Sequence, residues 1–434
     1  MKMTHPTAAW FWAAALSLAL AACNLPSTPM PGAAIPATHL PTAVLPATPQ
    51  PTAPPALTPA SSSAPSGICL APKAHTGLLP SPFNSLPGVI AAFLNSGATP
   101  DELGAALSAA SLGNPPNPVL AGDLNGDGKL DVVAAVVDPT SSSRPPAGEM
   151  LVFTCAGGAY RLSYTLVSTQ NSGAPAVQTV EDLNADGKAE IVAGQQTCGA
   201  HTCFTSVQVL AWSGNGFQNR LTGRTDDIPY PHVQINAVTE GGIAEIVIQG
   251  GMIDSVGAGP QRTETRTWAF DQASGNWLLA SDALAPSNYR IHLVQDADAT
   301  LRKGDVNQAL VVYNWVLSDQ PPLQDYQNPS SEKLTLGAYA AYKIAVIHLS
   351  RAETGAAQQM LDQMARSYPA GTPEYAFLEM ALAYQSALTG GDASKACNAV
   401  TEYSLAHPSQ VLDPLGPQVF GYSNKSFGAQ DMCP

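Results

Sequence analysis

Short apolar runs bounded by turn residues dominate the middle of the chain. Residues 132–137 (Val-Val-Ala-Ala-Val-Val) and 191–193 (Ile-Val-Ala) each follow a loop rich in Asp, Asn and Gly. β-Branched runs of this length are typical of buried strands. Three further segments combine an apolar strand, a Gly-containing turn and an aromatic residue that opens the return strand: 151–160, 209–217 and 268–277. This combination is the pattern of a β-hairpin.

These hairpins recur at a nearly constant interval. Their aromatic residues Tyr160, Phe217 and Trp277 are 57 and 60 residues apart, and Asp182 lies 59 residues after Asp123 in the loops that precede the strands. A period in this range indicates a repeat architecture with one four-stranded unit per repeat. We therefore predict three such units.

Helical patterns flank the repeats. Ser85 precedes a predicted helix that ends near Leu94, and Thr99-Pro100-Asp101-Glu102 is a capping box with Pro at the first helical position. These features predict a helical hairpin within residues 67–116. We interpret residues 290–294 as the last strand, after which the apolar period becomes helical.

The first 66 residues differ from the rest in composition. An apolar run ends in Leu20-Ala21-Ala22-Cys23, which resembles a bacterial lipobox and implies cleavage of residues 1–22 and lipidation of Cys23. An ordinary secretory signal with an incidental Cys is the alternative. Residues 24–72 contain no charged residue, and Pro, Ala, Thr and Ser dominate residues 25–66. Such a segment cannot bury a core, so we expect a disordered stalk over residues 23–66.

Net charge limits the partners. The 434-residue chain has a formal net charge of −14 and only 12% charged residues. Nucleic acids and anionic lipid headgroups bind basic surfaces, so we expect no nucleic-acid partner and membrane contact only through the lipid anchor.

The two Asp-rich loops share one arrangement of oxygen-bearing groups. Each has them at loop positions 1, 3, 5 and 9, with Gly at position 6 and a main-chain carbonyl at position 7. Ca²⁺ takes about 6–8 oxygen ligands and needs a sharply turned backbone. We predict two structural Ca²⁺ sites with these ligands: Asp123, Asn125, Asp127, the carbonyl of Lys129 and Asp131; and Asp182, Asn184, Asp186, the carbonyl of Lys188 and Glu190.

An EF-hand is excluded because it needs Glu at position 12 and a helix on each side, whereas Ala134 and Ala193 occupy position 12 and apolar runs follow. Asp-Gly and Asn-Gly pairs are also ordinary turn residues, but two copies with matching spacing favour a metal site. A third loop aligns through Glu245, and we expect no metal there because the ligand positions hold Ala237, Thr239 and Gly241.

The Asp-x-Asn-x-Asp-Gly-x-x-Asp/Glu loop followed by a β-branched strand resembles the FG-GAP/VCBS repeats of integrin-like β-propellers. The resemblance covers residues 117–295 and implies a partial or small β-propeller in which the cation stiffens a loop within each blade without taking part in catalysis. Propellers typically have about 4–8 blades. With three repeats, the ring is expected to be incomplete, or closed by degenerate or helical segments.

The region from 296 to 408 resembles tetratricopeptide (TPR) helical pairs, because small residues, an aromatic residue and a terminating Pro recur at the spacing of a TPR second helix. The positions are Gly304-Asp305, Ala309, Tyr313 and Pro321; Ala345, Ala357 and Pro369; and Gly391-Asp392, Ala396 and Pro408. The resemblance implies a face that binds peptide or protein. A generic helical bundle is the alternative.

Six cysteines besides Cys23 suggest disulfides in an exported protein. Cys198 and Cys203 flank a predicted hairpin tip and are expected to pair. For the remaining four we consider Cys69 with Cys155, and Cys397 with Cys433, which would fix the tail 409–434. His201 between two cysteines also permits a zinc site, but a fourth ligand is missing from the segment.

Catalytic motifs are absent from the sequence: it contains no His-Glu-x-x-His, no Gly-x-Ser-x-Gly and no phosphate-binding Gly loop. Asp226-Asp227, and Asp254 with Glu264, are the candidate paired carboxylates, although acidic loop residues are usually solvated surface. We expect a multidomain α+β lipoprotein, anchored outside the bacterial cytoplasmic membrane, that binds protein or glycan at the cell surface without catalysis. The alternatives are a secreted hydrolase or lyase with an active site on the propeller face, and an extracytoplasmic assembly factor that works through the helical domain.

Overall fold

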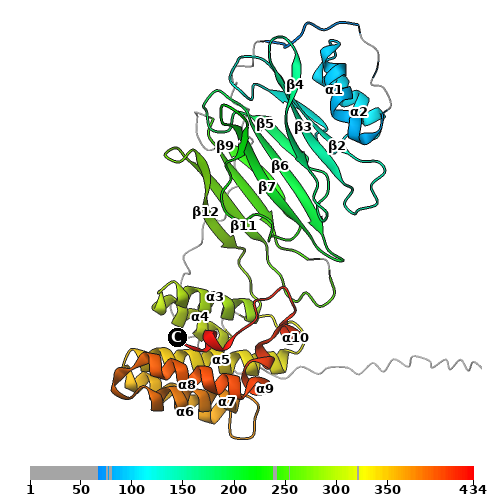
Figure 1. Ribbon diagram of the computed structural model, residues 1–434. Coiled ribbons are helices and arrows are strands. Elements are labelled where there is room, and N and C mark those ends of the chain that lie inside the picture. Colours follow the sequence, from blue (N-terminus) through cyan, green and yellow to red (C-terminus); the bar gives the residue numbers. More distant parts are fainter. Residues whose placement is uncertain (1–66, 75–76, 78–80, 238–241, 254, 320–321) are drawn as a thin grey trace, which may run out of the picture. The chain divides into compact units, whose positions relative to one another are not determined.

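The computed structural model describes residues 67–74, 77, 81–237, 242–253, 255–319 and 322–434 (Figure 1). The predicted signal peptide, the lipidation site Cys23 and the stalk lie outside the described residues, as do Thr239, Gly241 and Asp254. Within the described part, no helix is both long and apolar enough to cross a membrane.

The segment from residue 119 to residue 284, which we call the β region, contains three four-stranded antiparallel sheets (Figure 1). In each sheet every strand pairs with its neighbour in sequence. The strands are β1 Val119–Gly122, β2 Asp131–Val137, β3 Gly148–Cys155 and β4 Tyr160–Val167; β5 Ala176–Glu181, β6 Glu190–Cys198, β7 Cys203–Trp212 and β8 Phe217–Asn219; β9 His232–Ala237, β10 Ala244–Gly250, β11 Glu264–Asp271 and β12 Asn276–Leu284. The three predicted hairpins are confirmed.

The continuous apolar runs arise because both faces of the first two sheets are covered. In β2, Val132, Ala134 and Val136 pack against helices, whereas Val133 and Ala135 pack against the second sheet. In β6, Ile191 faces the first sheet and Val192 faces the third. Alternate residues of a strand point to opposite faces, so a strand covered on both sides must be apolar at every position.

The third sheet has one apolar face and one polar face. Ala244, Ile246 and Ile248 of β10 pack against the second sheet, together with Trp268 and Trp277. The alternate residues Glu245 and Gln249 point the other way, and Val247 between them is paired with Gln234 and Thr267. A polar face of this kind suits contact with water.

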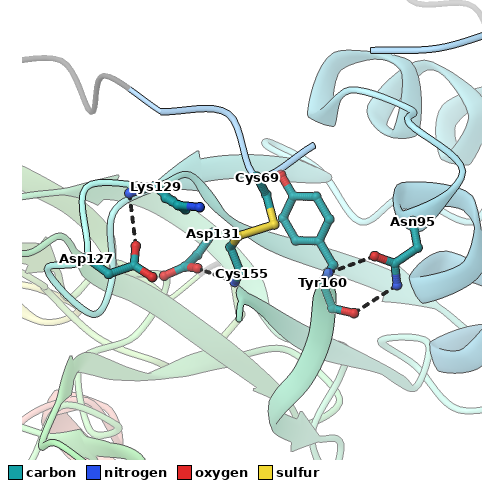
Figure 2. The surroundings of a disulfide bond; sticks show 7 residues. All are labelled: Cys69, Asn95, Asp127, Lys129, Asp131, Cys155 and Tyr160. Carbon is teal, nitrogen blue, oxygen red and sulfur yellow. Dashed lines mark hydrogen bonds between the residues drawn. A yellow bond between two sulfur atoms is a disulfide. The ribbon is translucent and has the colours of Figure 1, made fainter. Parts of the chain in front are cut away.

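The predicted helical hairpin is confirmed and covers the outer face of the first sheet. Helix α1 spans Leu86–Asn95 and α2 spans Pro100–Ala109, and both halves of the capping box between Thr99 and Glu102 are formed. The Asn95 side chain exchanges two hydrogen bonds with the backbone of Tyr160, at 2.7 and 2.9 Å, and so ties α1 to the start of β4 (Figure 2).

The prediction of a strand at 290–294 is wrong, because these residues begin helix α3, Arg290–Arg302. The apolar residues Ile291, Val294 and Ala297 lie on one helical face and are buried. Arg290 is 1% exposed, and its guanidinium binds Asp319, Asp325 and the carbonyl of Val316. The run of five residues is too short to distinguish a strand from a buried helix by periodicity.

Residues 290–432 form the helical region, in which consecutive helices pair. The pairs are α3 with α4 (Val306–Ser318), α5 (Pro329–Ser350) with α6 (Thr354–Ser367), and α7 (Tyr375–Ala387) with α8 (Ala393–Ala406), followed by α9 (Pro408–Val411) and α10 (Pro417–Phe420). The second helix of each pair has a fully buried Ala at its fourth position: Ala309, Ala357 and Ala396. Small residues at this point let neighbouring helices approach closely.

The six described cysteines form three disulfides, Cys69–Cys155, Cys198–Cys203 and Cys397–Cys433. The expected pair Cys198–Cys203 is confirmed at the tip of the β6–β7 hairpin. The two pairings considered for the other four cysteines are also present. Cys69–Cys155 fastens the segment before α1 to the end of β3, and Cys397–Cys433 fastens the C-terminal segment to α8.

Candidate functional site

The first Asp-rich loop, residues 123–130, connects β1 to β2 and is organised by its own side chains. The Asp123 carboxylate accepts hydrogen bonds from the backbone N–H groups of Asp127 and Gly128, at 3.1 and 2.7 Å. Asn125 Oδ1 accepts from the N–H of Asp127 at 2.9 Å, and Asp127 Oδ1 accepts from the N–H of Lys129 at 2.9 Å. The side chains at positions 1, 3 and 5 therefore turn inward over one short stretch of backbone.

The second loop, residues 182–189, repeats these contacts between β5 and β6. Asp182 accepts from the N–H groups of Asp186 and Gly187 at 3.2 and 2.9 Å. Asn184 Oδ1 accepts from Asp186 at 2.8 Å, and Asp186 Oδ1 accepts from Lys188 at 2.9 Å. Because the same atoms bond at the same loop positions, the two segments adopt one loop type.

Backbone angles agree with this correspondence. Loop positions 4 and 6 have positive φ in both copies: 80° and 78° at Gly126 and Gly128, and 61° and 85° at Ala185 and Gly187. Ala185 is the exception in residue type, since the left-handed region is unfavourable for residues with a Cβ. The loop conformation is thus retained even where its sequence does not favour it.

The position-9 carboxylates, Asp131 and Glu190, are buried under the loops, with exposed fractions of 0% and 1%. Each accepts a hydrogen bond from the N–H at position 2, Leu124 at 3.1 Å and Leu183 at 2.9 Å. Asp131 also accepts from the N–H of Cys155 at 2.7 Å, beside the Cys69–Cys155 disulfide (Figure 2).

Burial raises the pKa of Asp131 to about 6 and that of Glu190 to about 8. The neighbouring loop carboxylates contribute in the same direction, Asp127 and Asp123 for Asp131, and Asp186 and Asp182 for Glu190. Each loop thus gathers three acidic groups whose mutual repulsion a cation would relieve.

The oxygen-rich donor sets of the loops suit a hard cation such as Ca²⁺. In this structure the loop carboxylates are turned toward backbone N–H groups. Across the described residues, no three His, Cys, Asp or Glu side chains converge as a ready-made metal cluster. The donor chemistry fits Ca²⁺, and binding would require the side chains at positions 1, 3 and 5 to turn from the N–H groups toward the ion.

Each loop is also hydrogen-bonded to the segment before it. The N–H at position 8 donates to a carbonyl in all three repeats: Leu130 to Gly67, Ala189 to Asp123, and Ala244 to Leu183, at 3.0, 2.7 and 2.8 Å. Ala244 directly precedes Glu245, so the third repeat has the predicted register. Glu245 is only partly buried, whereas Asp131 and Glu190 are almost completely buried.

A cavity of about 560 Å³ lies at the opposite ends of the inner strands. Its walls come from the segments that precede β1, β3, β5 and β9, the starts of β5 and β9, the end of β2, and the facing parts of β6 and β7. Polar side chains in the walls are Asn114, Gln178, Gln196, Thr205 and His232, and the prolines are Pro115, Pro145, Pro146 and Pro231. Sequence reasoning missed this cavity because its residues come from three repeats and form no local motif.

Three of the candidate carboxylates, Asp226, Asp227 and Glu264, are bound by arginines, and Asp254 lies outside the described residues. Asp226 pairs with Arg224 at 2.8 Å, and Arg266 contacts Asp227, Glu264 and Asp282 at 2.5, 2.6 and 3.3 Å. Burial raises the pKa of Glu264. Carboxylates that share one guanidinium are held as an ion-pair network, which opposes their use as a general acid and base.

A second polar cluster is buried in the helical region. Asp298 accepts hydrogen bonds from the hydroxyl groups of Tyr313 and Tyr339, and Lys343 Nζ donates to the carbonyls of Asp431 and Cys433 at 2.9 and 2.8 Å. Burial raises the pKa of Asp298 and lowers that of Lys343. These contacts fix the C-terminal segment against α5 and complete the core.

Comparison of the chain with protein-family models, curated proteins and solved structures found no match.

Proposed function

We propose that this protein is a calcium-stabilised binding module held outside the cytoplasmic membrane by a lipid anchor. The observation that supports the calcium assignment is the pair of loops with matching hydrogen bonds, each with a buried carboxylate at position 9. Asp123, Asn125, Asp127, Asp131 and the Lys129 carbonyl would hold one ion. Asp182, Asn184, Asp186, Glu190 and the Lys188 carbonyl would hold the other.

Calcium would act here as a structural ion. The loops connect the first two strands of the first and second sheets, and each touches the preceding segment through the N–H at position 8. An ion in each loop would neutralise the gathered carboxylates and stiffen the edge along which the sheets meet.

In this proposal the β region is an open, propeller-like array of three blades. Helices α1 and α2 pack on the first blade, and the polar face of the third sheet ends the series. The helical pairs, with a buried Ala at the same position of each second helix, support a TPR-like assignment for the helical region. Both assignments are analogies of fold, which do not identify a ligand.

Binding is favoured over catalysis because the described candidate carboxylates, Asp226, Asp227 and Glu264, are engaged by Arg224 and Arg266. The three disulfides favour an oxidising compartment outside the cytoplasm. The net charge of −14 disfavours nucleic acid as a ligand. A protein or a glycan at the cell surface remains as the proposed partner.

The test is a thermal melt with Ca²⁺ and with chelator. A ligand that binds only the folded state stabilises it by about 2.7 kcal/mol per site at 100 times its Kd. We expect Ca²⁺ to raise the melting temperature of the wild type, and Asp127→Ala with Asp186→Ala to remove most of that response. The matched control is Asp101→Ala with Asp362→Ala, two exposed helical positions. A chelator effect that persists in the loop variant would refute the calcium assignment.

A further inference from the structure

The cavity at the ends of the inner strands has no role in the proposed calcium sites. It occupies about 560 Å³, within the range of about 300–1,000 Å³ usual for small-ligand sites. It lies where β1, β5 and β9 begin, whereas the Asp-rich loops follow the ends of β1 and β5. Ligand binding and calcium binding would therefore use opposite edges of the β region.

Among the described residues, its lining is polar and, apart from His232, holds no ionisable side chain. None of the described residues that form the walls is Lys, Arg, Asp or Glu. The amide groups of Gln178 and Gln196, and the hydroxyl of Thr205, form no hydrogen bond within the described part of the chain. Each of these groups can both donate and accept. Apart from His232, such a lining provides no counter-charge for an ionic ligand.

Backbone groups near the cavity are already occupied. The Asn114 side chain donates to the carbonyls of Ala174 and Pro175 at 3.2 and 2.9 Å. Asn117 donates to the carbonyls of Val177 and Gln178 at 3.2 and 3.0 Å. A peptide that adds a strand needs free main-chain acceptors along a sheet edge. The start of β5, an edge strand of its sheet, has these acceptors engaged by asparagines.

We infer that this cavity binds a neutral oligosaccharide through the amide and hydroxyl groups of Gln178, Gln196 and Thr205. Sugar hydroxyls donate and accept at once, as these side chains do, and the rings of Pro115, Pro145 and Pro231 supply apolar surface for sugar C–H groups. The inference rests on the proposed function as a binding module and specifies its ligand class. Since no Phe, Tyr or Trp is among the described lining residues, affinity for a single trisaccharide is expected to be weak, with a Kd on the order of 1 mM.

The experiment is a titration of the full chain in Ca²⁺ with maltotriose, cellotriose, laminaritriose and chitotriose, followed by NMR saturation transfer. Trigalacturonate and a proline-rich decapeptide serve as the anionic and peptide probes. The test variant is Gln178→Ala with Gln196→Ala. Gln218→Ala is the matched control, because Gln218 is exposed on β8 of the same sheet and does not line the cavity.

The expected result is saturable binding of at least one neutral trisaccharide that weakens about tenfold or more in the double variant and is unchanged in Gln218→Ala. No binding of any neutral trisaccharide, equal binding by the double variant, or cavity-dependent binding of only the anionic or peptide probe would overturn the inference. The melting response to Ca²⁺ is measured on the same samples. A melting response to Ca²⁺ without sugar binding would reject the proposed ligand class and leave the calcium assignment standing. The lack of a melting response would reject the calcium assignment, whatever the result with sugars.

Discussion

The backbone N–H of Ala189 donates to the carbonyl oxygen of Asp123 at 2.7 Å, so the end of the second Asp-rich loop holds the start of the first. The Lys188 side chain of the second loop lies beside Gly126 of the first, where an added Cβ would be only 3.2 Å from two of its carbons. The two loops therefore share one continuous edge of the β region. A substitution in either loop is expected to change the stability of both.

The strained residue in the second loop provides the first prediction. Ala185 has φ of 61°, and a non-Gly residue in this region costs about 1–3 kcal/mol. A Gly variant removes this strain, but its unfolded chain has greater conformational entropy, which cancels part of the gain in stability. We expect Ala185→Gly to stabilise the β region by about 0.5–1 kcal/mol in chelator, as measured by calorimetry.

Gly187→Ala is the reciprocal variant. A Cβ there meets no atom within 4 Å, so its effect reports backbone strain alone, at a φ of 85°. It should destabilise by about 1–2 kcal/mol. Stabilisation by this variant, or destabilisation by Ala185→Gly, would contradict the loop conformation described here.

The buried carboxylate of Asp131 provides the second prediction. It accepts hydrogen bonds from the buried N–H groups of Leu124 and Cys155, and Asp131→Ala would leave both without a partner. Each unsatisfied buried donor costs about 1–3 kcal/mol, so we expect a loss of about 2–5 kcal/mol in chelator.

Asp127→Ala is its control within the same loop. Asp127 accepts from the exposed N–H of Lys129, which water can satisfy, so the expected loss in chelator is below about 1 kcal/mol. Denaturant unfolding followed by far-UV circular dichroism would compare the two variants. Equal losses would show that Asp131 has no special structural role.

Local sequence patterns predicted the elements that local chemistry determines. Thr99 and Glu102 specify a helix start by reciprocal hydrogen bonds, and the hairpins were recognisable from their turns and aromatic residues. The run 290–294 was misinterpreted because five residues are too few to distinguish a strand from a buried helix, and the contacts that hold Arg290 are not local. Its actual partners, Asp319 and Asp325, lie about 30 residues further along the chain.

The cavity could not be predicted for a related reason. Gln178, Gln196 and His232 come from separate strands, and no short motif relates them. The loop residues of the candidate metal sites were recognisable because all their oxygen donors lie within nine consecutive positions. Their inward orientation and the burial of Asp131 and Glu190 emerge only from packing against the neighbouring strands.

Disulfide loop length provides the third prediction. Cys69 and Cys155 are 86 residues apart, whereas Cys198 and Cys203 are 5 apart. In the chain-entropy model the longer loop gives about 4–5 kcal/mol and the shorter about 2 kcal/mol. Cys69→Ala with Cys155→Ala should therefore lower the melting temperature more than Cys198→Ala with Cys203→Ala. The reverse order in scanning calorimetry would contradict this account.

Acid sensitivity at His292 provides the fourth prediction. The imidazole is 2% exposed and contacts Ser287 Oγ at 2.7 Å and the carbonyl of Pro260 at 3.2 Å. Burial lowers the pKa of His292, the charge of Arg262 adds to this effect, and Asp296 opposes it. The neutral form is therefore favoured in the folded state.

The sign follows from proton uptake. Below the ordinary imidazole pKa of about 6.5, the unfolded chain binds a proton that folded His292 resists, so the stability contributed by this residue falls as pH decreases through that value. His292→Gln keeps a donor for the Pro260 carbonyl and removes the titration. Protonation of Asp131 and Glu190, whose pKa values are raised, acts in the opposite direction over this range, so the prediction concerns the difference between variants. Relative to the wild type, we expect His292→Gln to shift the change in melting temperature between pH 7.5 and pH 5 (roughly the range over which imidazole titrates) in favour of pH 5, whereas His201→Gln, at an exposed hairpin tip, does not. The same change in wild type and His292→Gln would show that His292 does not contribute to the acid response.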